Sequence, residues 1–216
     1  VADLAEAHIC ALRHLLAGGE SAALNLGARE ARAPWLAFTD DDCRVSANWL
    51  EVIERAAGGA GPACALTGRV IAGAPEGAAV IAPSLREKDR EATYRSPGFR
   101  DVLFGNNMAI PAGLLRGVGG FDERLGPGTS APAAEDNDLG YRLLRAGILI
   151  RYIPTMTVTH RSWRSGFEQV RVFRGYGVGQ GTFYGKHVRR GDLHMAARMA
   201  RNLWDSGRDL SGAIVL

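Results

Sequence analysis

The sequence holds only three cysteines, Cys10, Cys43 and Cys64, and no C-x-x-C pair. An odd number of widely spaced cysteines argues against a disulfide framework and a zinc knuckle. It favours a reducing compartment, so we expect a cytoplasmic protein, at most bound to the inner face of a membrane. The chain also lacks any run of about 18 apolar residues and any charged-then-apolar opening segment, so we expect neither a membrane-spanning helix nor a secretory signal.

Acidic and basic residues are distributed unevenly along the 216 residues. From Arg161 onwards ten Lys/Arg stand against four Asp/Glu, whereas the first 160 residues hold 16 Lys/Arg against 19 Asp/Glu. A basic segment behind a slightly acidic body suits an anionic partner. We expect a membrane surface or a phosphate-bearing substrate rather than nucleic acid, and a solvated basic surface is the open alternative.

Short apolar runs alternate with amphipathic helical segments over about the first 150 residues. The strand-like runs include residues 35–38, 63–73 and 148–154, and the helical segments include 21–31 and 135–146. This alternation predicts an α/β fold with a mostly parallel, Rossmann-like sheet flanked by helices. We expect a catalytic domain over residues 1–165 and, over 166–216, a basic helical extension interrupted by glycines.

Three consecutive aspartates, Asp40, Asp41 and Asp42, directly follow the apolar run 35–38. In open α/β sheets, ligands bind at the carboxyl ends of the strands. Carboxylate oxygens at such a place suit Mg²⁺ or Mn²⁺, which usually share their coordination with substrate phosphates. An exposed acidic turn that caps the next helix is the alternative.

A second acidic cluster, Glu135, Asp136 and Asp138, begins a helix. The helix dipole and the free backbone N–H groups stabilise a carboxylate there in its ionised form. An ionised carboxylate that faces a pocket can accept a proton from an attacking hydroxyl. Ordinary N-terminal capping explains the same residues without any catalytic role.

His160 ends the β-branched run TVTH, and Arg161, Trp163 and Arg164 follow it closely. An imidazole at a strand end can complete the coordination sphere of a cation, although a lone histidine is more often structural. Arginine side chains suit pyrophosphate oxygens, and an indole face suits a sugar ring.

Three stretches together resemble the family 2 glycosyltransferases of the GT-A fold. They are GGESAALNLGAREARAPWLAFTDDDCRVSANWL, FGNNMAIPAGLLRGVGGFDERL and AEDNDLGYRLLRAGILIRYIP, and the resemblance covers roughly residues 18–165. It implies a transferase that moves a sugar from a nucleotide-diphosphate-sugar to a saccharide or lipid-linked acceptor.

The resemblance also implies a role for each motif. The Asp-x-Asp motif falls on residues 40–42, with Asp42 on the divalent cation, Mn²⁺ or Mg²⁺, and Asp40 nearer the ribose. Asp136 is then the catalytic base of a single displacement with inversion, and His160 is a metal ligand. The residues that the resemblance and the local chemistry assign to the donor are Asp40, Asp41, Asn106, Asn107, Glu135, Arg161, Trp163 and Arg164.

Two other functions use the same acidic clusters. One is a metal-dependent phosphoesterase or nucleotidyltransferase, and the other is a catalytically inactive domain that binds a nucleotide diphosphate or acts as a scaffold. Family members usually begin with a strand, a helix and a second strand that grip the nucleobase, and we expect this chain to lack them. An uncovered sheet edge then favours a homodimer.

The segment LHMAARMARNLWDSG, residues 193–207, has the pattern of a basic amphipathic helix. Such a helix can rest on a membrane surface, which suits a lipid-linked acceptor. Packing against the core or a partner subunit is the alternative.

Overall fold

The computed structural model describes residues 18–59, 64–74, 84–161 and 166–214. Its helices are α2 (Glu20–Glu30), α3 (Trp49–Gly59), the short η1 (Gly105–Asn107), α4 (Ala112–Gly117), α5 (Glu135–Arg145), α6 (Gly166–Val188) and α7 (Leu193–Ile214). Its strands are β1 (Trp35–Phe38), β2 (Cys43–Val45), β3 (Cys64–Ala72), β4 (Ala92–Tyr94), β5 (Met108–Pro111) and β6 (Leu149–His160).

The described strands form one mixed sheet in the order β1-β5-β3-β6-β2, and β4 pairs with the first half of β6. β3 and β6 run parallel, whereas β5 runs antiparallel to both β1 and β3, and β2 and β4 run antiparallel to β6. The α/β prediction is confirmed, but the expectation of a mostly parallel sheet is wrong. A parallel pair needs a long crossover connection, usually a helix. The described residues between β3 and β5 contain no such helix, and β5 enters the sheet from the opposite end.

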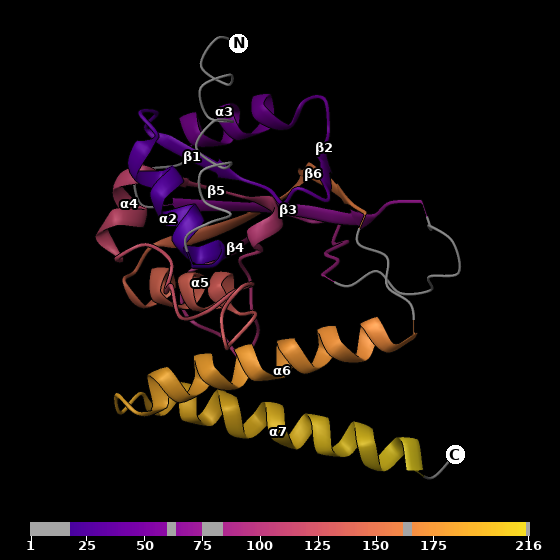
Figure 1. The fold of residues 1–216 in the computed structure, drawn as a ribbon. Helices are drawn as coiled ribbons and strands as arrows, with labels where there is room; N and C mark the ends of the chain where they lie inside the picture. The colour runs from indigo at the N-terminus through magenta and orange to yellow at the C-terminus, as the bar shows by residue number, and fades with distance from the viewer. Residues whose placement is uncertain (1–17, 60–63, 75–83, 162–165, 215–216) are drawn as a thin grey trace.

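Helices cover both faces of this sheet (Figure 1). α3 lies on one face, where Trp49, Val52 and Ile53 join the apolar residues of the central strands. α2, α4 and α5 lie on the other face over a larger core that includes Leu139 and Leu143. The two cores hold the sheet between them and fix the strand ends, where the acidic motifs lie.

α6 and α7 form an antiparallel hairpin beneath α5 (Figure 1). The expected interruption by a glycine is found only in the turn between the two helices, where Gly191 has a φ of 80°. Within α6 the expectation is wrong, because α6 is one continuous helix of 23 residues. A Cβ atom on Gly179 would lie 2.5 Å from the carbonyl oxygen of Ala133, so this glycine lets α6 approach the loop before α5 closely. The glycines lower helix propensity, and the tertiary contacts offset that cost.

The loop-proximal half of the hairpin shares a core with the rest of the chain. Phe183, Tyr184 and Met195 pack with Leu125 and Tyr141 in one apolar cluster. The helices after residue 165 are therefore packed against the α/β layer. The expected domain boundary between residues 165 and 166 stays a prediction. None of the helices in the described ranges combines the length and the hydropathy that a membrane crossing requires.

Candidate active site

The three aspartates lie in a tight turn between β1 and β2. The backbone N–H of Cys43 donates to the carbonyl of Asp40 at 3.1 Å, which closes the turn. β2 then pairs with the end of β6 in a register that places Cys43 opposite His160. The N–H of Arg161 donates to the carbonyl of Asp42 at 2.9 Å. The short return strand thus holds the aspartate turn against the carboxyl end of β6.

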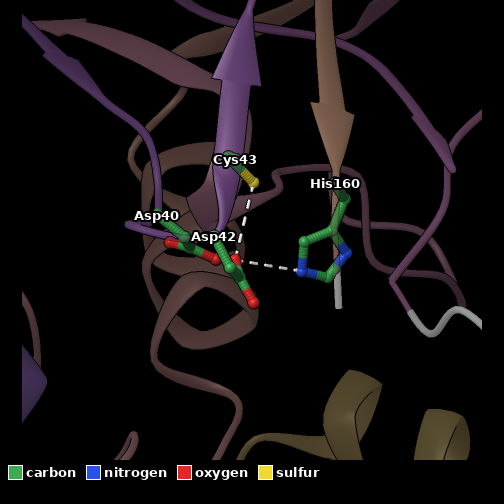
Figure 2. A group of neighbouring side chains, drawn as sticks. All are labelled: Asp40, Asp42, Cys43 and His160. Carbon is green, nitrogen blue, oxygen red and sulfur yellow. Dashed lines mark hydrogen bonds and ion pairs between the residues drawn. The ribbon is translucent and has the colours of Figure 1, made fainter. Parts of the chain in front are cut away.

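Four side chains at this point form a group that fits a divalent cation. One possible ligand atom from each of Asp40, Asp42, Cys43 and His160 lies within 4.8 Å of the others. Figure 2 shows these side chains converging, with His160 Nε2 3.3 Å from the Oδ1 of Asp42. The predicted metal residues Asp42 and His160 are therefore in contact, and the two carboxylates of the group suit Mn²⁺ or Mg²⁺.

Negative charge accumulates around this group. Burial and the charge of Asp42 raise the pKa of Asp40 to about 6. Burial and the charges of Asp40 and Asp136 raise the pKa of Glu20, at the start of α2, to about 7. The charge of His160 lowers the pKa of Asp40, but burial and Asp42 outweigh it. A bound divalent cation would offset the crowding of these carboxylates further.

The start of α5 contributes two further carboxylates. The Oδ2 of Asp136 accepts the N–H of Gly105 at 2.9 Å, and its Oδ1 accepts the N–H of Asn137 at 2.7 Å. Burial raises the pKa of Asp136 to about 6 despite these two hydrogen bonds. Burial and the charge of Asp136 raise the pKa of Glu135 to about 8. Because the charge of Asp40 acts on both groups, the two acidic motifs share one electrostatic environment.

The third acid of that motif does not belong to this environment. Asp138, in the first turn of α5, is fully buried and binds Arg142, Lys186 and His187 at 2.7, 2.7 and 2.8 Å. Burial alone would raise its pKa, but the hydrogen bond from His187 and the two positive charges outweigh burial and hold the pKa at about 2. Asp138 therefore anchors α6 to α5.

The two asparagines of η1, Asn106 and Asn107, differ in the hydrogen bonds of their side chains. Asn107 is fully buried, and its amide binds the carbonyls of Arg69 and Met156 and accepts the indole N–H of Trp49. These bonds fill the β-bulge between Gly68 and Arg69, so the side chain of Asn107 supports the turn. Its contact with the donor stays a prediction. The buried Oδ1 of Asn106 has no hydrogen-bond partner among the described residues.

A cavity of about 540 Å³ opens beside the metal group. Arg44 and Arg161 line it together with Asp41 and Asp42, so basic and acidic side chains meet at this cavity. Trp163 and Arg164, which the sequence also assigns to the donor, lie outside the described residues. Glu20, Cys43 and Arg44 are new members of the site. Only the adjacency of Cys43 and Arg44 to the aspartates gave any signal for them, and Glu20 gave none.

Comparisons with known proteins decide the family. Residues 2–109 match the family described as "Glycosyl transferase family 2". The chain belongs to glycosyltransferase family 2. It is 31% identical over 166 residues to the "Pre-mycofactocin glycosyltransferase" of Mycobacterium tuberculosis, in both the CDC 1551 / Oshkosh and the ATCC 25618 / H37Rv strains.

That match covers 73% of this family 2 chain and 34% of the relative, so the chain spans about a third of the length of the curated relatives it matches. Among solved structures, it is similar to the "Mannosyltransferase PcManGT from Pyrobaculum calidifontis in complex with GDP-Man and Mn2+". The TM-score is 0.52 at 19% sequence identity, over 79% of this chain and 44% of that one. This likeness confirms the predicted GT-A fold.

Proposed function

We propose that this chain transfers a sugar from a nucleotide-diphosphate-sugar to an acceptor hydroxyl, with inversion at the anomeric carbon. The observation that carries the proposal is the shared environment of the metal group and the start of α5, in which burial, and to a smaller extent the charge of Asp40, raises the pKa of Asp136. Family membership supports it, as does a GT-A neighbour solved with GDP-Man and Mn²⁺.

Asp136 is the base in this proposal. Its two backbone hydrogen bonds fix the orientation of the carboxylate, and a pKa of about 6 leaves it ionised at neutral pH yet basic enough to take a proton. As the acceptor oxygen bonds to the anomeric carbon, its proton passes to Asp136, and the bond from that carbon to the diphosphate oxygen breaks. Attack from the face opposite the leaving group inverts the configuration.

Asp42 and His160 would hold the divalent cation, with Asp40 beside them. When bound, the cation supplies positive charge that stabilises the departing nucleoside diphosphate. Arg44 and Arg161 line the neighbouring cavity and would bind the same diphosphate oxygens. The carboxylates of Asp40 and Asp42 suit both Mn²⁺ and Mg²⁺.

The test is nucleoside diphosphate release from a panel of nucleotide-sugars with Mn²⁺ and candidate acceptors. Asp136→Asn should lower the rate about 10²- to 10⁴-fold, as expected for loss of a general base. Mn²⁺-dependent nucleotide binding should persist. Asp205→Asn is the matched control, because its carboxylate is exposed on α7. Release that is unchanged in Asp136→Asn would refute the base assignment.

The same assay separates the two alternatives. A phosphoesterase or nucleotidyltransferase would cleave the donor at full rate without any acceptor. A binding or scaffolding domain would bind nucleotide with Mn²⁺ but release none.

We further propose a lipid-linked acceptor, with the α6–α7 hairpin resting on an anionic membrane surface. Seven of the ten exposed large apolar side chains in the described part of the chain lie on these two helices: Val170, Phe173, Tyr176, Val178, Leu193, Leu203 and Trp204. Six exposed arginines accompany them, against two exposed acids among the described side chains of the hairpin. Apolar side chains with basic neighbours are typical of helices that lie in a membrane interface.

A further inference from the structure

Cys43 gives the metal group a donor that a site for Mg²⁺ or Mn²⁺ does not need. It lies directly opposite His160 in the antiparallel β2–β6 ladder, and residues paired in this way have their side chains on the same face of the sheet. Its Sγ is 3.8 Å from the Oδ1 of Asp42, and the Nε2 of His160 is 3.3 Å from the same oxygen. Figure 2 shows both contacts.

We infer that this group also takes a thiophilic divalent cation, zinc in particular. Its four ligands are the Cys43 thiolate, the imidazole of His160 and one oxygen each from Asp40 and Asp42. On binding, a zinc–sulfur bond forms, the S–H bond breaks and the thiol proton passes to the solvent.

The dimensions of the group suit a tetrahedral zinc ion. Bonds of about 2.0 to 2.3 Å set the ligand atoms of a tetrahedron about 3.3 to 3.8 Å apart. The two contacts to Asp42 already have these lengths, 3.3 and 3.8 Å. The longest separation in the group is at most 4.8 Å, and rotation of the partly exposed carboxylates by about 1 Å would close it.

The ligand types decide which cation the full set prefers. Thiolate and imidazole select zinc and similar metals, whereas Mg²⁺ and Mn²⁺ favour oxygen ligands. The general affinity order of N, O and S sites also places Zn²⁺ above Mn²⁺. At equal free concentration, zinc should therefore displace Mn²⁺ from this chain.

Displacement has a consequence for the reaction, and this part of the inference rests on the proposed function. Four protein ligands close a tetrahedral zinc site and leave no position for a diphosphate oxygen. Mn²⁺ or Mg²⁺ held by Asp42 and His160 keeps open positions for the donor. Zinc is then an inhibitor, and Cys43 sets the sensitivity to it.

The binding test does not depend on activity. Chelator-treated protein is loaded with one equivalent of Zn²⁺ and studied by zinc X-ray absorption. The wild type should show a zinc–sulfur shell at about 2.3 Å, and Cys43→Ser should lack it. Cys64→Ala is the matched control, since it removes a buried thiol at the start of β3 and should leave the shell intact. A wild-type site without sulfur, or a sulfur shell that survives in Cys43→Ser, would overturn the inference.

Affinity gives a second readout. Competition with a fluorescent zinc chelator should show zinc affinity lowered at least about tenfold in Cys43→Ser, while Mn²⁺ affinity changes far less. An equal loss of both affinities would mean that the variant disturbs the turn and that Cys43 is no selective ligand. If transfer is observed, the zinc concentration that halves it should rise at least about tenfold in Cys43→Ser. If no transfer is observed, the proposed function fails while the absorption experiment still decides the zinc site.

Discussion

At the residue scale, His160 has the most constrained position in the site. It ends β6, its side chain is 6% exposed, and its Nε2 is 3.3 Å from Asp42. Because it would supply the one nitrogen ligand to Mn²⁺, we expect His160→Ala to weaken Mn²⁺ binding at least about tenfold, measured by electron paramagnetic resonance of free Mn²⁺. Asp41→Asn is the control, since Asp41 is exposed and outside the metal group. Equal affinities in the two variants would remove His160 from the ligand set.

The sequence places a residue at the end of an element where its neighbours in the chain form a clear pattern. Asp42 and Asp136 each follow or begin an element with a clear pattern, so their position at an element end could be read directly. Glu20 could not be found in this way, because the effect of the Asp136 charge on its pKa depends on how α2 and α5 pack on the sheet. The burial of Asn107 depends on a β-bulge that joins residues 40 to 50 positions away, and no local pattern reports it.

At the element scale, α5 joins the site to the hairpin. Residues two apart on a helix point to nearly opposite sides, so Asp136 accepts the N–H of Gly105 while Asp138 binds Lys186 and His187 of α6. We expect Asp138→Asn to lower the free energy of unfolding by about 3 kcal/mol at neutral pH, because Lys186, His187 and Arg142 lose their shared carboxylate. Denaturant unfolding measures this change, with Asp205→Asn as an exposed control that costs less than about 0.5 kcal/mol.

The same carboxylate predicts an acid dependence. Its folded pKa of about 2 lies below the ordinary value of 3.8, so its stabilisation is complete above about pH 4 and is lost as the pH falls towards 2. The lost contribution is about 2 kcal/mol. Asp138→Asn should therefore lose less stability than the wild type over this range, and parallel curves would contradict the assignment.

The sequence-based prediction was wrong about two features of the elements, the direction of the strands and the continuity of α6. Alternating helices and strands predict layers, but they do not report which end of the sheet a strand enters, and β5 enters from the opposite one. Glycine-rich sequence predicts a break, but the glycine at position 179 faces the backbone of Ala133 and serves a close contact. Both outcomes are set by partners distant in the sequence.

At the scale of the whole molecule, the hairpin presents apolar and basic side chains on a surface that has no described partner. We expect the protein to co-sediment with vesicles that contain phosphatidylserine. Phe173→Glu with Trp204→Glu should lower this partition at least about tenfold, since each apolar side chain contributes about 1.5 to 3 kcal/mol when buried. Leu50→Glu is the control, because Leu50 is exposed on α3. Equal partition of both variants would exclude the hairpin as the contact and favour a protein partner for it.

The outer edge of β1 is the second surface of interest. β1 is the last strand of the described sheet order, and unpaired strand edges favour pairing with another chain. We propose that a second copy covers it, and we expect size-exclusion chromatography with light scattering to give a dimer. Trp35→Pro removes a backbone donor from β1 and should shift the mass towards a monomer. A clean monomer of the unaltered chain would exclude the dimer.

The ion pairs around Asp138 also limit how far the chain can be shortened. Composition suggests cutting the chain before Gly166 to obtain a smaller enzyme. That cut would remove Lys186 and His187, which would leave the buried carboxylate of Asp138 without most of its compensating charge. It would also uncover Tyr141. A minimal unit that keeps Asp136 in place must therefore include both hairpin helices, even though neither carries a residue that we assign to the reaction.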